Sequence, residues 1–390
     1  MLARPLSADR IKVENFYMRL FFQSPAPMKH NMIRRAALAI LLAASAFAQQ
    51  PATPPTQRPP RPPKPGVKTP GVQIPFASLK PDYEFPVPGA PDWIAVGESI
   101  WISNAPKNTV TRIDPKTNKI ADTVTGLNRP CSGLAIGFGS LWVPTCGDQS
   151  LARVDLKTAK ITATIPAGVA NSEGGLAVTA DSVWLLTDSK STLSRLDPDK
   201  NTIVAEVRLP AGCFTVAFGP PGPDAALWVT CTQANQVLRV DPVTNLVTNR
   251  LRLDARQLDS PPPGAQPAGT QPITQPRFLT VGEGAVWVLC QGEGNVVKID
   301  PKTMAVVATI EVGVPGSGGD IAAGEGAIWV SSFGFPISKI DPKSGKVVQQ
   351  FVGDGGDAIR AAGGAVWLSN LRQGVVWRLD PRRIAATLAE

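Results

Sequence analysis

The stretch Gly282–Pro301, G-E-G-A-V-W-V-L-C-Q-G-E-G-N-V-V-K-I-D-P, decides the fold, because its pattern occurs seven times in the chain. Each copy has a small-residue turn, a branched apolar residue, Trp and an apolar run, followed by a basic residue, an apolar residue and Asp. The seven tryptophans are Trp101, Trp142, Trp184, Trp228, Trp287, Trp329 and Trp367. The seven aspartates are Asp114, Asp155, Asp197, Asp241, Asp300, Asp341 and Asp380. Strand-like pieces repeated about every 40 residues are typical of a β-propeller.

Each repeat contains four short strand-like segments. In the second repeat these are residues 133–136, 141–145, 151–155 and 160–165. The first turn is rich in Gly, which permits positive φ, and the last turn begins Asp-Pro in most copies. We therefore predict an all-β, seven-bladed propeller of four-stranded antiparallel blades over residues 77–390. Residues 83–87 resemble the end of a fourth strand, so we expect an N-terminal strand to complete the last blade and close the ring.

A leader and a linker are predicted ahead of the propeller. From Met32 the chain has the charged pair Arg34 and Arg35, an apolar stretch over 36–44, and a small-residue cleavage site ending at Ala48. This pattern predicts a secretory signal peptide within residues 1–48, with the true start at Met32 and cleavage after Ala48. Residues 49–76 are Pro-rich and are predicted to be an extended linker. The protein is therefore expected to be periplasmic or secreted.

The excess of basic residues belongs to these N-terminal segments. The chain has 39 basic and 31 acidic residues. The leader holds seven basic and two acidic residues, and residues 49–72 hold four basic and none acidic. The remaining 28 basic and 29 acidic residues are nearly balanced. The folded part gives no reason to expect a nucleic-acid partner.

Residues that occur in all seven repeats are predicted to be scaffold, and those that break the pattern are candidates for function. The repeated Trp is expected to fill space between blades, and the basic residue before each Asp to pack its stem. Charged residues interrupt the pattern where the first strands begin, at the mouth of the predicted channel. They are Asp92, Glu173, Arg277, Asp320, Asp357 and Arg360, with Trp93, Phe214 and Phe278 beside them.

Two interpretations of this charged mouth follow. It could bind a polar ligand or a cation such as Mg²⁺ or Ca²⁺. The alternative is a solvated channel lined by ordinary ion pairs. A Pro-rich insertion at 254–276 lies on the same face, where it would act as a lid or, by its composition, form a disordered insertion.

Five cysteines predict disulfides in an exported protein. With a two-residue turn at Phe138-Gly139, Cys131 and Cys146 are predicted to lie directly opposite each other and to pair. Cys213 and Cys231 form a second candidate pair, offset by one residue from that register. Cys290 is left over. A zinc site is not expected, because the chain has no Cys-x-x-Cys and a single His.

The phrases G-A-V-W-V, N-T-V-T-R-I-D-P-K-T-N-K-I and A-T-I-E-V-G resemble the repeats of YVTN-type surface and periplasmic propellers. They also resemble the streptogramin (virginiamycin B) lyases, whose blades carry G-x-x-W-F and I-G-R-I-x-P. The resemblance covers about residues 90–390 and implies a seven-bladed propeller. In the lyases it further implies elimination on a cyclic depsipeptide, with a His base and a magnesium ion near acidic residues at the mouth. The one His here, His30, precedes the predicted cleavage site, so no residue matches that base.

Two functions are therefore carried forward. The first is an exported, monomeric binding module, with an unknown protein, peptide or small-molecule ligand at the channel mouth. The second is a lyase-like or metal-assisted enzyme in which Glu173, Asp320 or Asp357, with a pKa raised by burial, acts as the base. A quinoprotein-like dehydrogenase is a third hypothesis, for which no cofactor motif is visible. No transmembrane span is expected in the mature chain.

Overall fold

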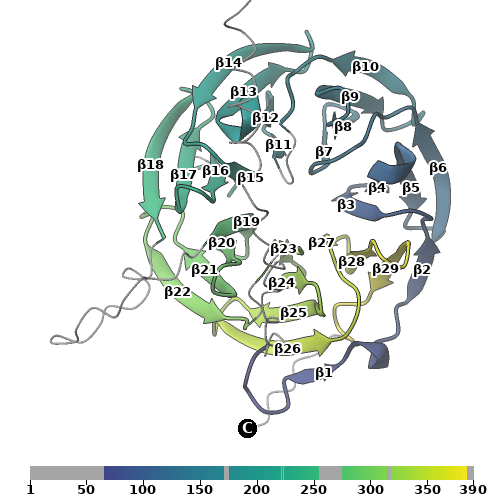
Figure 1. Cartoon of the computed structure of the whole chain (residues 1–390), viewed down its shortest axis with the longest axis vertical. Coiled ribbons are helices and arrows are strands. Elements are labelled where there is room, and N and C mark those ends of the chain that lie inside the picture. Colours follow the sequence, from purple (N-terminus) through teal and green to yellow (C-terminus); the bar gives the residue numbers. More distant parts are fainter. Residues whose placement is uncertain are drawn as a thin grey trace, which may run out of the picture. The chain divides into compact units, whose positions relative to one another are not determined.

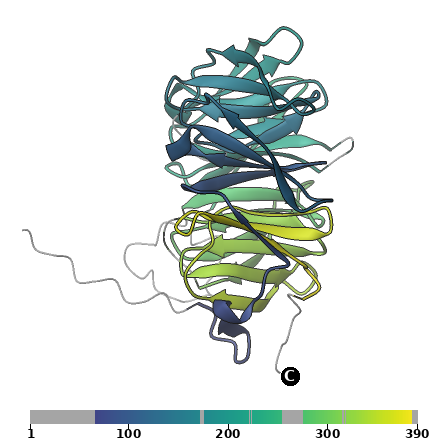
Figure 2. The ribbon, with the colours of Figure 1, turned by 90° about the vertical axis from the view of Figure 1, so that its right-hand side faces the viewer.

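The computed structural model describes residues 66–170, 175–220, 222, 224–253, 275–313, 316 and 318–383. Within these ranges seven separate sheets surround a central axis (Figure 1), and the ring is seen edge-on in Figure 2. The predicted seven-bladed propeller of four-stranded antiparallel blades is confirmed. The described helices are three single 3-10 turns, Phe76–Ser78, Ala105–Lys107 and Asp188–Lys190. None of them has the length and apolarity of a membrane span.

The strands of each blade run in chain order from the channel to the rim. Blade 1 has β3 (Pro91–Val96), β4 (Ile100–Asn104), β5 (Thr109–Asp114) and β6 (Lys119–Thr125). Blade 2 has β7 (Ala135–Gly137), β8 (Ser140–Thr145), β9 (Ser150–Asp155) and β10 (Ile161–Ile165). Blade 3 has β11 (Leu176–Val178), β12 (Val183–Thr187), β13 (Thr192–Asp197) and β14 (Thr202–Arg208). Blade 4 has β15 (Cys213–Gly219), β16 (Ala226–Cys231), β17 (Gln236–Asp241) and β18 (Leu246–Arg252).

The remaining three blades follow the same order. Blade 5 has β19 (Pro276–Gly282), β20 (Ala285–Cys290), β21 (Asn295–Ile299) and β22 (Val306–Glu311). Blade 6 has β23 (Asp320–Gly324), β24 (Ala327–Ser332), β25 (Phe335–Asp341) and β26 (Lys346–Val352). Blade 7 takes three strands from the end of the described chain, β27 (Ile359–Ala362), β28 (Ala365–Asn370) and β29 (Val375–Leu379).

Two N-terminal strands add to the last two blades. β2 (Tyr83–Pro86) pairs antiparallel with β29, so the seventh sheet has the order β2-β29-β28-β27. β1 (Gln73–Pro75) pairs parallel with β26 and forms a fifth strand on blade 6. Residues 66–76, assigned from the sequence to the end of the linker, lie against the ring because buried Gln350 accepts a hydrogen bond from the Val67 N–H at 2.9 Å. Whether β2 holds the ring closed energetically stays a prediction.

The repeated Trp and basic residue form the frame between blades. In every blade they are directly opposed on the second and third strands, as Trp142 and Arg153 are in blade 2. All seven tryptophans are almost completely buried, and the Arg153 guanidinium lies 4.9 Å from the Trp142 ring centroid. Its Nη1 donates to Asn201 Oδ1 of blade 3 at 3.1 Å. Arg378 likewise donates to the Pro115 carbonyl at 2.9 Å, which links blade 7 to blade 1. These contacts match a structural role for the repeated basic residue.

Both predicted cysteine pairs are disulfides in the structure, but the register argument for the first was wrong. Cys131 lies in the loop before β7, which starts only at Ala135. Its N–H donates to the Pro144 carbonyl, so Cys131 does not lie directly opposite Cys146. Cys213 and Cys231 are register partners, because an irregularity that begins after Cys213 removes the expected offset. Cys290 is a buried free thiol whose pKa is raised by burial.

Candidate functional site at the channel mouth

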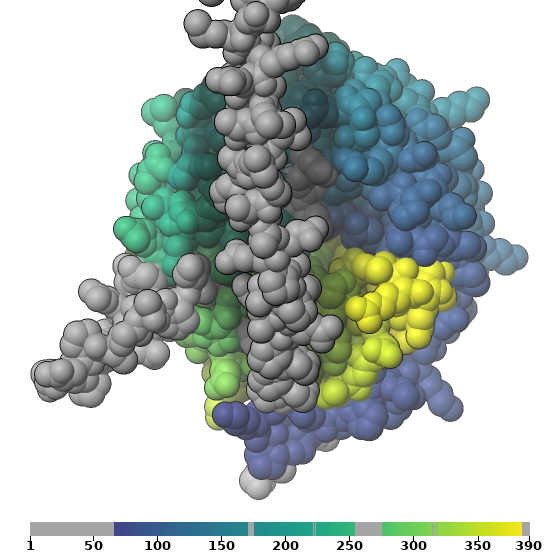
Figure 3. Space-filling view, viewed as in Figure 1, coloured from purple at the N-terminus to yellow at the C-terminus, as the bar shows by residue number. Residues whose placement is uncertain are grey.

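The mouth is the end of the channel at which the first strand of each blade begins. In the space-filling view the blades follow one another around the ring in chain order (Figure 3). A cavity of about 290 Å³ at the mouth is lined from blades 1, 5, 6 and 7, and its charged lining residues are Asp92, Arg277, Asp320 and Asp357. A second cavity of about 370 Å³ continues along the channel and shares Trp93 and Asp320 with the first. The structure therefore brings four of the six predicted charged residues into one cavity, and Arg360 lines the second.

An irregular backbone at the start of three first strands sets the direction of several of these side chains. The pairing register shifts after Pro91 in β3, after Cys213 in β15 and after Pro276 in β19. Asp92, Trp93, Phe214 and Arg277 all fall within these shifts. An extra residue in one strand bends it and re-aims its side chains, which is why such bulges are common beside binding sites.

Hydroxyl groups on the neighbouring strands stabilise these bulges. The Trp93 N–H donates to Ser103 Oγ at 3.0 Å, and the Thr215 N–H donates to Thr230 Oγ1 at 3.1 Å. The hydroxyls of Thr215 and Thr230 donate in turn to the Arg277 carbonyl, at 2.9 and 2.6 Å. Buried backbone groups that leave the ladder thus keep hydrogen-bond partners.

Aromatic rings hold Arg277 in place. Its guanidinium lies 4.4 Å from the Phe214 ring centroid and 5.9 Å from that of Phe278. The Phe214 and Phe278 rings meet edge to face at 5.3 Å, and Trp93 follows 6.2 Å from Phe278. Arg277 Nη1 also donates to Gln291 Oε1 at 3.3 Å. A cation over aromatic faces is preorganised, because the rings restrict its rotamers.

Asp320 and Arg360 form an ion pair in the channel wall. The Asp320 carboxylate also accepts from the Ile321 N–H at 2.8 Å and the Ile359 N–H at 3.4 Å. Burial raises the pKa of Asp320, and the charge of Arg360 opposes that rise. The ion-pair interpretation therefore describes these two residues, and Asp320 is engaged by three donors.

Asp357 and Asp92 are the other carboxylates of the mouth cavity. Asp357 is buried and accepts from the Gly319 N–H at 3.4 Å, while Asp92 is half-buried. No group of three or more His, Cys, Asp or Glu side chains in the described ranges is arranged to hold a metal ion. The expectation of Mg²⁺ or Ca²⁺ stays a prediction. Glu173 and residues 254–274 of the insertion lie outside the described residues.

Sequence reasoning missed the part of the cavity contributed by the turns between second and third strands. Phe333 and Leu371 line the mouth from blades 6 and 7, and Gln291 of blade 5 donates to the Gly318 carbonyl at 2.7 Å. All three stand four residues after their Trp. These turns lie on the mouth face, so comparing that position between repeats would have found them.

No protein-family model and no curated protein sequence matches the chain. Among solved structures it is similar to a streptogramin B lyase, with 19% identity and a TM-score of 0.60 over 76% of this chain and 96% of that chain. It is also similar to virginiamycin B lyase from Staphylococcus aureus, with 18% identity and a TM-score of 0.60 over 76% of this chain and 97% of that chain. Hydrazine synthase from Kuenenia stuttgartiensis gives 14% identity and a TM-score of 0.57, over 77% and 97% of the two chains. At these identities the comparisons establish the fold, a seven-bladed propeller like that of the streptogramin lyases.

Proposed function

We propose that this protein is an exported binding module that holds a small ligand or short peptide at the channel mouth. The observation that carries the proposal is the 290 Å³ cavity in which Arg277, fixed on aromatic rings, lies in the same lining as Asp92 and Asp357. A concave site with apolar walls and a few convergent polar groups is typical of ligand pockets. Because both charge signs and aromatic rings are present, the ligand class is a zwitterion with an aromatic group.

Two disulfides support the part of the proposal that concerns export. Disulfides persist in oxidising compartments and are rare in the cytosol. The predicted signal peptide agrees with this location. The proposal is checked by expressing the full chain in a bacterial host and locating it in the periplasm or medium, with cleavage after Ala48 read by N-terminal sequencing.

Binding is favoured over catalysis by the state of Asp320, one of the three candidate bases. Asp320 is engaged by Arg360 and two backbone N–H groups. Removing a proton from substrate would require a carboxylate with free acceptor capacity near the reacting atom. The only His of the sequence lies at position 30, ahead of the predicted cleavage site.

Ligand-observed NMR with zwitterionic dipeptides that contain one aromatic residue tests the binding proposal. Arg277→Gln is expected to abolish the signals seen with wild-type protein, and Asp357→Asn to weaken them. Arg250→Gln is the matched control, because Arg250 is exposed on the outer strand β18. Dipeptide signals of equal strength in wild-type and Arg277→Gln protein would exclude the mouth as their site.

The alternative is a lyase-like activity at the same mouth. It is favoured by the structural likeness to the lyases, one of which was crystallised in a catalytically inactive form with quinupristin. The test is incubation of wild-type protein with quinupristin, with and without Mg²⁺, followed by chromatography. Conversion that Asp357→Asn abolishes would replace the binding proposal with an enzymatic one.

A further inference from the structure

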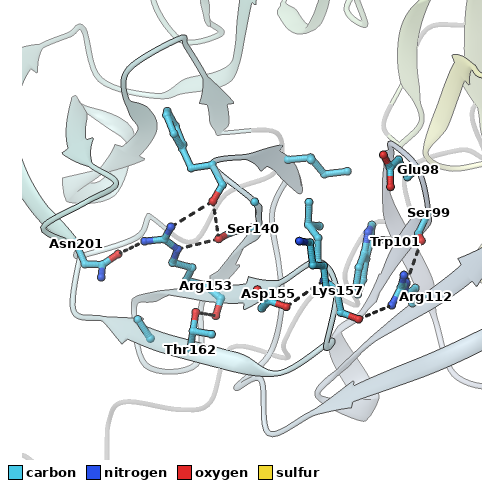
Figure 4. Close-up of a pocket in the computed structure, with 15 residues that line it drawn as sticks. Glu98, Ser99, Trp101, Arg112, Ser140, Arg153, Asp155, Lys157, Thr162 and Asn201 are labelled. Carbon is cyan, nitrogen blue, oxygen red and sulfur yellow. Dashed lines mark hydrogen bonds between the residues drawn. The ribbon is translucent and has the colours of Figure 1, made fainter.

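A larger cavity lies at the other end of the blades, where the turns between first and second strands and between third and fourth strands gather. It has a volume of about 820 Å³, against about 370 and 290 Å³ for the two channel cavities. Its lining comes mainly from blades 1 and 2 (Figure 4). Ligand pockets usually have volumes of roughly 300–1,000 Å³, so this cavity has room for a small organic molecule.

Two departures from the sevenfold repeat meet in this cavity. The residue after the repeated Asp is Pro in six blades and Leu156 in blade 2. The residue four before the repeated Trp is Gly, Ala, Asp or Glu in six blades and Phe138 in blade 2. Both line the cavity, although they are 18 positions apart in the sequence.

The departures are also fixed in conformation. The Leu156 N–H donates to the Gly139 carbonyl at 3.1 Å, a hydrogen bond that Pro cannot make. It ties the two turns of blade 2 together. Phe138 has a φ of 56°, in the left-handed region that is unfavourable for a bulky side chain. With half-buried Ile136 and Ala163 these side chains give the cavity an apolar floor.

Cationic groups stand on either side of that floor. Figure 4 shows Arg153 and Arg112 on opposite sides of the turn that carries Asp155 and Lys157. Arg153 uses its donors on Ser140, Asn201 and backbone carbonyls. The hydrogen bonds of Arg112 in the described part of the chain come from Nε, to Ser99, and from Nη1, to Asp122 and the Lys157 carbonyl. Its Nη2 therefore has donor capacity for a ligand, and Lys157 is exposed beside it.

The acidic groups of the lining differ in availability. Asp155 is held by its own turn, where hydrogen bonds from Thr158 and Lys157 lower its pKa. Glu98 lies next to Ser99 in the turn between the first and second strands of blade 1 (Figure 4). The groups open to a ligand are thus Lys157, the Nη2 of Arg112, whose Nη1 is ion-paired with Asp122, and the Glu98 carboxylate, above apolar side chains.

We propose that this cavity is a second binding site, for an amphipathic organic anion that carries one carboxylate or sulfonate on an aromatic or branched apolar body. The apolar body would cover Phe138 and Leu156, and removing that surface from water would drive binding. The anion would accept hydrogen bonds from Arg112 and Lys157, and such charge-assisted bonds to guanidinium are strong and directional. This site is separate from the channel mouth and does not depend on the function proposed there.

Anilinonaphthalene sulfonate tests the site, because its fluorescence rises when its aromatic rings enter an apolar pocket. The double variant Phe138→Glu with Leu156→Pro installs residues that other blades carry at the same positions, including Glu283 and Glu325, whose φ values of 47° and 53° match that of Phe138. It should therefore keep the fold, which an unchanged near-ultraviolet circular dichroism spectrum verifies. We expect it to bind the dye at least about tenfold more weakly than wild type, equivalent to about 1.4 kcal/mol.

A second comparison isolates the anion. Lys157→Gln should weaken the sulfonate dye about threefold while leaving the uncharged analogue N-phenylnaphthylamine unchanged, since one charge-assisted contact is lost. Lys343→Gln is the matched control, because it occupies the equivalent turn position in blade 6. Dye binding that survives the double variant, or that is lost in Arg277→Gln instead, would overturn the proposal.

Discussion

Truncation of Phe85 tests whether the N-terminal strand holds the propeller closed. Phe85 lies in β2, opposite Val376 of β29, and is 4% exposed. Its ring centroid is 6.0 Å from that of Trp367, and it belongs to a cluster that also contains Ile94 of blade 1. The side chain therefore joins the first and last blades as well as filling blade 7.

The expected loss follows from this burial. Replacing a buried Phe with Ala costs about 3–5 kcal/mol, from lost transfer free energy and the cavity left behind. Domains are stable by only about 5–15 kcal/mol, so Phe85→Ala should remove a large share of the total. Tyr83→Ala is the control in the same strand, because Tyr83 is 46% exposed and its loss should cost about 1 kcal/mol or less.

Urea unfolding followed by tryptophan fluorescence measures both variants. With a denaturant dependence of about 3 kcal/mol per molar urea, Phe85→Ala should lower the midpoint by about 1–1.7 M and Tyr83→Ala by about 0.3 M or less. The m-value should stay near that of wild type, because the same surface is exposed on unfolding. If Phe85→Ala unfolds at the same urea concentration as Tyr83→Ala, the strand pairs with blade 7 without stabilising the ring.

Three further outcomes are expected. Asp320→Asn should destabilise the protein by about 3–5 kcal/mol, because it leaves Arg360 without its counter-charge. The double variant Asp320→Leu with Arg360→Met should recover most of that loss in the same urea assay, and equal losses in the two variants would show that the ion pair is not the cause. Pro276→Cys should form a third disulfide with Cys290, since positions 276 and 290 are register partners as Cys213 and Cys231 are. Mass spectrometry after alkylation should then find Cys290 unalkylated because it is held in the disulfide, and an alkylated Cys290 would contradict the register. Asp380 has its pKa lowered to about 2 by hydrogen bonds from Arg382, so its contribution to stability is present above about pH 4 and is lost as the pH falls toward 2; the melting temperature of Asp380→Ala should therefore fall less than that of wild type over this range.

The fold was predictable from the sequence because each blade solves the same packing problem with the same residues. A Trp between neighbouring blades must face a cationic side chain across the strand pair, and an Asp must accept the N–H groups of the following turn, as Asp155 does from Lys157. These requirements recur in every blade, so they appear as a period. The loop before β7 leaves no such trace, which is why direct opposition was wrongly expected for Cys131 and Cys146.

The grouping of the charged mouth residues was also predictable, whereas their roles were not. Ring symmetry places the start of every first strand at one end of the channel, so Asp92, Arg277 and Asp357 had to converge once the blades were assigned. Which carboxylate meets which cation depends on rotamers and bulges. The sequence did not show that Asp320 would be neutralised by Arg360 while Arg277 would lie against aromatic rings.

A break in a repeat points to function only when no local requirement explains it. The contacts of Arg239 depart from the shared pattern for such a local reason, because its guanidinium donates within blade 4, to Thr248 and to the Asp224 carbonyl of an enlarged turn. Phe138 and Leu156 are not required by their turns, since blades 5, 6 and 7 form the same two-residue first turn with Glu or Gly and six blades carry Pro after the repeated Asp. A left-handed Phe is unfavourable for folding, and half-buried apolar side chains around an open cavity leave hydrophobic stabilisation unused. The combination is understandable if a ligand covers those side chains, and the dye experiment measures that directly.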